Sequence, residues 1–166
     1  MYKLDFFRGN INILRYLVTH DDIAIDVRDD QGCTPLILAA VHNNSISVEI
    51  LLRGKGNGEG GANVLESDRQ GQNVLHKAAK EGNQDVVEAI REFLQEDKWK
   101  LRKLMVQEDR RGNTPLMLAL DSVITGGTLE CLLKIEEDLN SGGNQPISLI
   151  KQMNQMKETP MHRACR

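Results

Sequence analysis

Polar and apolar residues recur along the chain in one fixed order, and that order predicts where helices begin. It reads Asp, two residues, Gly, one residue, Thr or Asn, one residue, Leu, two residues, then Ala followed by Ala or Leu; it occupies residues 29–40, 68–79 and 109–120. A shorter copy, Thr-Pro-Met-His-x-Ala, occupies residues 159–164. A further apolar unit follows each of the longer copies at a similar offset. We therefore expect each copy to form a turn and two antiparallel helices.

The residues at the predicted helix starts suit that place. Thr34, Thr114 and Thr159 are N-cap candidates, and Pro follows each at the first helical position, where its missing N–H costs nothing. The second copy has Asn73 at the corresponding position. The Gly of each turn suits the positive φ that a tight turn needs. We predict helices that start near residues 34, 73, 114 and 159.

The repeated pattern resembles the ankyrin repeat, whose Thr-Pro-Leu-His-x-Ala signature recurs about every 33 residues. The resemblance covers nearly the whole chain and implies an all-α ankyrin-repeat solenoid of helix-turn-helix units with irregular insertions. Residues 1–166 are expected to form one array. We divide it into a partial repeat at 1–28, repeats at about 29–67, 68–108 and 109–153, and a truncated repeat at 154–166.

The spacing of the repeats predicts where the insertions lie. Corresponding turn positions at residues 32, 71, 112 and 157 are 39, 41 and 45 residues apart. Residues 54–60 hold four glycines and predict a mobile excursion. Residues 92–105 carry an apolar stripe and predict mostly helix, as an extension of the preceding helix or as an added short one. Residues 141–150 predict a loop followed by a helical turn.

Composition and charge argue against several classes of function. The net charge of −3 disfavours a protein that holds nucleic acid on a strongly basic face. Cys33, Cys131 and Cys165 are widely spaced and match neither a disulfide framework nor a zinc motif, which favours reduced thiols in a cytosolic setting. No stretch of eighteen apolar residues occurs, so we expect no transmembrane segment in this piece.

The motifs that could carry chemistry have a structural interpretation within the repeats. Gly56-x-Gly58-x-x-Gly61 formally matches a dinucleotide fingerprint, but the predicted flanking elements are wrong for one. His76 and His162 occupy the signature histidine position, where we expect the ring to hydrogen-bond the neighbouring turn.

The turn aspartates and Cys33 are the remaining candidates for catalytic chemistry. Asp29, Asp68 and Asp109 fall one in each turn, roughly 10 Å apart, which is too far for acid–base pairing. Cys33 leaves two interpretations open: a thiol whose pKa is lowered by a helix N-terminus, or a small filler in a turn. No nucleophile, base and orienting group share a neighbourhood, so we expect no catalytic residue, no cofactor and no metal site.

The tips of the predicted turns are the candidate protein-binding edge, because the arginines among them form a modest basic strip. The turn-tip residues are Asp30, Gln31, Arg69, Gln70, Arg110 and Arg111. Trp99, between two lysines, is either an exposed anchor for a partner or a lid over the next helix.

A narrower resemblance concerns the order of three segments. Pro-Leu-Ile-Leu-Ala at 35–39, Gly-x-Asn-x-Leu-His at 71–76 and Glu-Asp-x-x-Gly-x-Thr-Pro-Leu at 108–116 are together similar to the cytoplasmic ankyrin repeats of TRPA-type cation channels. That similarity implies a protein-interaction and coupling module that contacts neighbouring repeats and channel subunits. It would lie on the cytoplasmic side, membrane-associated if the parent is a channel. The alternative is a soluble ankyrin scaffold or adaptor that recruits another protein.

The two ends of the sequence predict a fragment of a longer array. Leu4, Phe6 and Phe7 stand where a preceding repeat is expected to cover them, and Arg166 falls inside the first helix of another copy. An uncovered repeat interface exposes the apolar surface that stacking buries. We therefore expect the isolated chain to fray and to self-associate.

Overall fold

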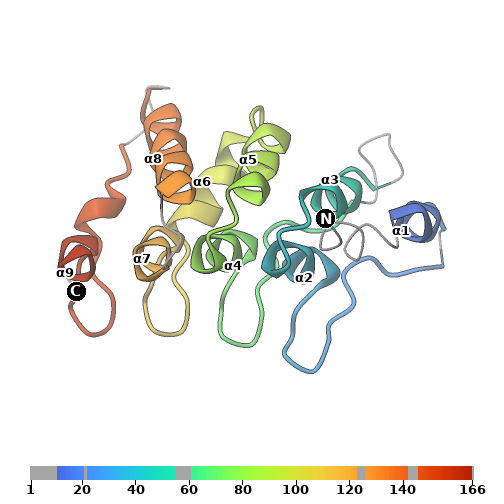
Figure 1. Ribbon diagram of the computed structural model, residues 1–166, viewed down its shortest axis with the longest axis horizontal. Helices are drawn as coiled ribbons and strands as arrows, with labels where there is room; N and C mark the ends of the chain where they lie inside the picture. Colours follow the sequence, from blue (N-terminus) through green and yellow to red (C-terminus); the bar gives the residue numbers. More distant parts are fainter. Residues whose placement is uncertain (1–10, 21, 55–60, 123–125, 142–145, 166) are drawn as a thin grey trace, which may run out of the picture.

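Short antiparallel helices stack in two layers along the long axis of the molecule (Figure 1). The structure, a computed structural model, describes residues 11–20, 22–54, 61–122, 126–141 and 146–165. The inner layer, next to the turns, contains α2 (Pro35–Val41), α4 (Val74–Glu81), α7 (Pro115–Asp121) and α9 (Pro160–Ala164). The outer layer contains α3 (Ser45–Arg53), α5 (Gln84–Phe93) and α8 (Gly126–Asn140), and α1 (Ile11–Val18) packs against α3.

The described residues form helices and one isolated bridge between Ser67 and Asn73, with no strand among them. The prediction of an all-α solenoid is confirmed. The turns between repeats all project from the same side of the array (Figure 1). The exact division of the chain into repeats stays a prediction.

The inner helices begin where the capping chemistry predicts. Thr34 precedes α2, and its side-chain oxygen accepts the N–H of Ile37 at 3.4 Å. Asn73 precedes α4, and its side-chain oxygen accepts the N–H of His76 at 3.0 Å. Since each such bond satisfies one of the amide groups that a helix start leaves unpaired, these residues fix the first turn. The predicted starts near residues 34, 73, 114 and 159 are confirmed.

Each turn between repeats is closed by one carboxylate or amide side chain. The Asp68 carboxylate accepts the N–H of Gln70 at 2.8 Å and of Gln72 at 2.9 Å. Asp29 and Asp109 make the same pair of bonds in their own turns. Asn154 takes this place in the last turn, accepting from the second and fourth residues after it. Side chains of this type bond to nearby backbone and so specify turns.

Successive turns are joined to one another by backbone hydrogen bonds. The N–H groups of Arg69, Arg110 and Gln155 donate to the preceding turn at 3.0, 2.8 and 3.1 Å respectively. Gly112 has a φ of +77°, and a Cβ there would lie 2.8 Å from the backbone nitrogen of Gln155. Glycine therefore serves two needs at this position: the left-handed backbone and the close approach of the next turn. Lys157 stands at the corresponding place in the last turn, with a φ of +61°.

Small and branched apolar side chains fill the space between the layers. Ala40, Ala78 and Ala79 are fully buried on the inner helices. Val87 and Leu132 are fully buried on the outer helices. Because each large aliphatic side chain contributes about 1.5–3 kcal/mol when it is buried, this interior is the main source of stability, and the alanines let neighbouring helices approach closely.

The insertion at 92–105 is mostly helical, as predicted, and forms an added helix rather than an extension. α5 ends at Phe93, and α6 (Lys98–Val106) begins after Asp97, whose side chain accepts the N–H of Lys100 at 3.1 Å. Leu101, Leu104 and Met105 anchor α6 in the interior.

Other predicted insertions fall partly or wholly outside the described residues. A 3-10 helix, η1 (Leu149–Lys151), follows residues 142–145, so the predicted helical turn in this region is confirmed. Outside the described residues lie 55–60, with most of the glycine excursion and two fingerprint glycines. Leu4, Phe6, Phe7 and Arg166 also lie outside them.

Opposite changes at the two equivalent turn positions test the need for glycine. Gly112→Ala should lower the free energy of unfolding by about 1–3 kcal/mol, because it adds backbone strain and presses on the next turn. Lys157→Gly should raise that free energy by roughly 0.5–1 kcal/mol, because it relieves the left-handed strain of a side-chain-bearing residue. Urea denaturation followed by circular dichroism measures both. Destabilisation by both changes would contradict this account.

Candidate functional site

A groove of about 810 Å³ lies between the turn tips and the inner helices. Two turns contribute Arg69, Gln70, Arg110 and Arg111 to its lining. The inner helices contribute basic, acidic and apolar side chains: Lys80 and Glu81 from α4, Leu118 and Asp121 from α7, and Arg163 from α9. Three consecutive repeats thus build one continuous surface.

The structure brings together four of the seven residues that the sequence predicts to bind a protein partner. Arg69, Gln70, Arg110 and Arg111 line the groove and are exposed. Asp30 and Gln31 are exposed on the preceding turn and lie outside the groove lining, while the Gln31 carbonyl accepts the N–H of Arg69. Their part in binding stays a prediction.

Trp99 is separate from the groove. It lies on α6, is 62% exposed, and has the Lys103 ammonium 5.0 Å from its ring centroid. A cation over the ring face is an attractive contact for an exposed indole. The side chain is open to solvent, as an anchor requires, and does not form a lid.

The groove carries an excess of positive charge. Five basic and three acidic side chains line it. Arg69, Lys80, Arg110 and Arg111 form no ion pair with any other residue that the structure describes. The groove therefore presents guanidinium and ammonium groups that are available to a ligand.

Two of the three groove carboxylates are already engaged. Burial raises the pKa of Asp109, but hydrogen bonds from Asn113, Gln72 and the turn backbone outweigh it, and the net pKa is lowered. Its negative charge is engaged by its own turn and by Gln72 of the preceding turn. Asp121 pairs with Arg163. Glu81 is the remaining carboxylate of the lining.

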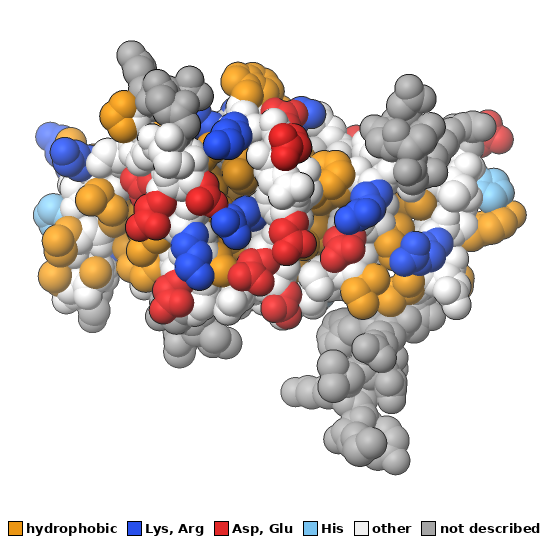
Figure 2. Space-filling model, turned by 90° about the horizontal axis from the view of Figure 1, so that it is seen from above, with side chains coloured by type: hydrophobic (Ala, Val, Ile, Leu, Met, Phe, Trp, Pro, Cys, Tyr) orange, Lys and Arg blue, Asp and Glu red, His pale blue; other side chains and the backbone are white. Residues whose placement is uncertain are grey.

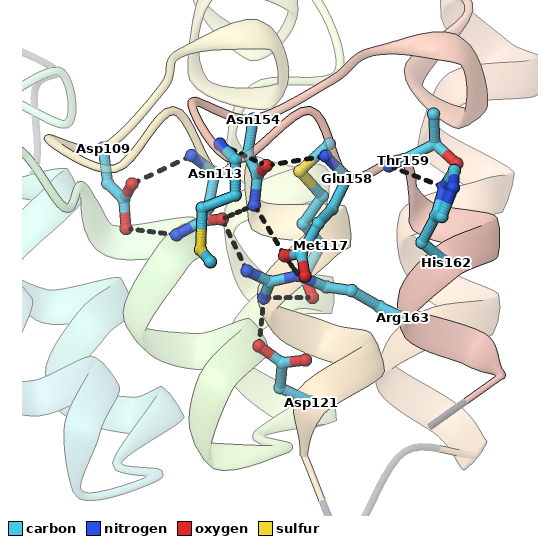
Figure 3. Close-up of polar contacts among 10 residues, drawn as sticks. Asp109, Asn113, Met117, Asp121, Asn154, Glu158, Thr159, His162 and Arg163 are labelled. Atoms are coloured by element: carbon cyan, nitrogen blue, oxygen red, sulfur yellow. Dashed lines mark hydrogen bonds and ion pairs between the residues drawn. The ribbon is translucent and has the colours of Figure 1, made fainter.

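Arg163 joins the last repeat to the one before it (Figure 3). Its guanidinium donates to the Asn113 side-chain oxygen at 2.7 Å, pairs with Asp121, and lies 3.6 Å from Glu158. The Asn154 amide donates to the same Asn113 oxygen at 3.1 Å. A charge that is 9% exposed is tolerable because it has these partners.

Sequence reasoning missed Arg163, although a signal existed. The residue directly after the signature histidine is basic in two copies, Lys77 and Arg163. Lys77 pairs with Asp68 at 2.7 Å within its own repeat. The longer, forked side chain of Arg163 reaches across to the neighbouring repeat. A basic residue directly after the signature histidine thus indicates a side chain that binds a polar residue of a turn.

His76 has the structural role that the signature predicts. It is fully buried; its Nε2 lies 3.0 Å from the Asn113 carbonyl of the next turn, and its Nδ1 accepts the N–H of Asn73 at 3.2 Å. Burial lowers the pKa of His76 to about 4, so the ring is neutral near pH 7. His162 is exposed, and its Nδ1 accepts the Thr159 N–H at 3.2 Å within its own repeat.

Of the two interpretations of Cys33 that the sequence leaves open, the structure favours the small filler in a turn. Burial, followed by the nearby Asp29 carboxylate, raises the pKa of the Cys33 thiol. The thiol is 7% exposed and fills space beside the turn. Desolvation disfavours the thiolate, as expected for a cysteine that serves as a small filler.

Within the described residues, no group of three or more His, Cys, Asp or Glu side chains is arranged to bind a metal ion. Within the same ranges, no helix combines the length and the apolar character needed to cross a membrane.

The amino-acid sequence is similar to one protein family and to several known proteins. The family model described as ankyrin repeats in three copies matches residues 6–60 and 59–142. The chain is 30% identical over 114 residues, 68% of its length, to human transient receptor potential cation channel subfamily A member 1. It is 39% and 35% identical over 74 residues, 45% of its length, to human and mouse Rabankyrin-5. These matches cover 10%, 6% and 6% of the relatives, so the chain spans a tenth or less of them.

The lowered pKa of His76 predicts loss of stability in mild acid. In the unfolded chain His76 binds a proton as the pH falls through about 6.5. In the folded chain the buried ring binds a proton only as the pH falls to about 4. Stability is therefore fully present above pH 6.5 and declines, by about 3 kcal/mol, as the pH falls through this window. In His76→Gln the decline should be smaller, although the variant is less stable at pH 7. Urea denaturation at several pH values measures both slopes; parallel slopes would refute the assignment.

Proposed function

The chain belongs to the ankyrin-repeat family, whose repeats form protein-interaction modules, and from this premise we propose that it binds another protein through the groove. The observation that carries the proposal is the row of exposed, unpaired arginines, Arg69, Arg110 and Arg111, on two adjacent turns. Guanidinium groups of this kind bind carboxylates and backbone carbonyls of a partner with defined geometry.

The groove suits binding because its backbone is held before a partner arrives. The carboxylates of Asp68 and Asp109 close the two turns, and the N–H of Arg110 bonds to the carbonyl of Gln70. A partner orders only the arginine side chains, so the entropic cost of binding is reduced. We assign no catalytic step to the groove, because Asp109 and Asp121 are committed to structural contacts.

We also propose a parent for this array. The similarity to the human subfamily A channel over 68% of the chain supports a piece of the cytoplasmic ankyrin region of a TRPA-like cation channel, on the cytoplasmic side of a membrane. There the array would couple partner binding to neighbouring repeats and channel subunits. The similarity to Rabankyrin-5 supports the alternative, a soluble scaffold. A full-length transcript that continues into six apolar segments of about 20 residues would decide for the channel.

Replacement of Arg69, Arg110 and Arg111 by Ala together tests the groove. Peptides selected from a displayed random library against the wild-type chain should bind the triple variant about tenfold more weakly or worse. Thermal stability should stay nearly unchanged, because exposed charges contribute little to folding.

The matched control removes the same charge elsewhere. Lys98, Lys134 and Lys151 are exposed and lie outside the groove lining, so their joint replacement by Ala should leave binding intact. Isothermal titration calorimetry of the selected peptides measures both variants. If the two triple variants weaken binding equally, or if no peptide depends on the arginines, the groove is not the binding site.

A further inference from the structure

The geometry points to the chemistry of the partner: we propose that the groove binds an acidic segment in the polyproline II conformation, with carboxylates at every third residue. This inference rests on the proposed function and names the kind of protein segment involved. It is carried by three observations: the register of the arginines, the charges that flank them, and the acidic charge of α5 and α8.

The arginines that face a ligand are in register with the repeats. Arg69 and Arg110 hold the same position in successive turns, and the N–H of each bonds to the turn before it. Stacked helical repeats lie about 8–10 Å apart. A polyproline II segment turns once every three residues and rises about 3.1 Å per residue, so its carboxylates at every third residue lie about 9 Å apart on one face. A β-strand places such residues on opposite faces.

The turn positions on either side of the two arginines give the row a charge pattern. Asp30 holds the same position in the preceding turn, and Gln155 holds it in the following turn. The row therefore reads acidic, basic, basic, neutral. A ligand whose two carboxylates face Arg69 and Arg110 would place its next residue of the same face opposite Asp30. A lysine there is favoured, and a third carboxylate is repelled.

The other cations of the groove lining also accommodate negative charge. Lys80 and Arg111 add two cations that have no ion-pair partner within the described ranges. Asp121 is neutralised by Arg163 (Figure 3).

Two helices of the outer layer, α5 and α8, would repel the same ligand. α5 carries three acidic residues and one basic residue, and α8 carries four acidic residues and one basic residue. Acidic side chains lie over this face with basic side chains among them (Figure 2). The basic residue of α5, Arg91, is already paired with Asp138 of α8 at 2.6 Å. An acidic segment is therefore directed away from α5 and α8, whereas α6, with four basic residues and no acidic one, does not share in this repulsion.

Defined peptides test the spacing. A fluorescent peptide built on Lys-Pro-Ala-Glu-Pro-Ala-Glu is compared, by anisotropy on the wild-type chain, with one of the same composition whose two glutamates are adjacent. The spaced peptide should bind at least about threefold more tightly, since only it meets both arginines. Arg69→Ala and Arg110→Ala should each weaken it about threefold, and Lys98→Ala should not. Equal binding of the two peptides, or an equal effect of Lys98→Ala, would overturn the proposal.

A charge reversal separates local pairing from general attraction. Arg69→Glu combined with Arg110→Glu should lose the spaced peptide and gain a peptide in which both glutamates are lysines. Asp30→Lys should strengthen binding of a peptide with three spaced glutamates. Failure of both exchanges would contradict the assigned register.

The selected library peptides distinguish this inference from the proposed function. If peptides require Arg69, Arg110 and Arg111 but show no spaced acidic residues, the inference fails and groove binding stands. If no selected peptide depends on the arginines, both fail. Enrichment of acidic residues at every third position supports both.

Discussion

The hydrogen bonds that close and connect the turns set the register in which the described repeats stack. In each turn one side chain, such as the Asp68 carboxylate, accepts two backbone N–H groups and fixes the loop. The next turn then bonds to it through a single backbone contact, from Arg110 to Gln70. Glycine is needed at the point of approach, because a Cβ on Gly112 would meet the following backbone. The helices are thereby stacked in a register that their apolar surfaces alone would not specify.

The groove is a consequence of this register. Because corresponding residues of successive turns lie side by side, the cations of Arg69 and Arg110 form a row rather than scattered charges. Buried polar contacts behind the row keep the repeats from sliding, since His76 and Arg163 each bond across to Asn113. Stability therefore depends on the buried contacts of these turns. The proposed recognition depends on the exposed side chains of the same turns.

Local chemistry made much of the fold predictable from sequence. Thr34 and Asn73 are residue types that commonly cap a helix when they precede an apolar run. The Asp and Gly that form each turn lie within a few residues of each other, so a short sequence pattern reveals the turn. The sequence predicts that the groove arginines are exposed, because they lie at the tips of turns that project from the stacked helices. Contacts between repeats were harder to predict. Arg163 acts on a turn fifty residues earlier, and the pKa of Cys33 reflects burial that the adjacent helix start does not reveal.

Amide hydrogen exchange measured by NMR tests the connection between turns most directly. The N–H groups of Arg69 and Arg110 belong to exposed loop tips, yet each donates to the preceding turn at 3.0 and 2.8 Å. Asp30 holds the position of Arg69 and Arg110 in the preceding turn. Its N–H donates to no backbone carbonyl within the described part of the chain. The account predicts slow exchange at Arg69 and Arg110, at rates close to those of the buried helices, and fast exchange at Asp30. Exchange as fast at Arg69 and Arg110 as at Asp30 would contradict it.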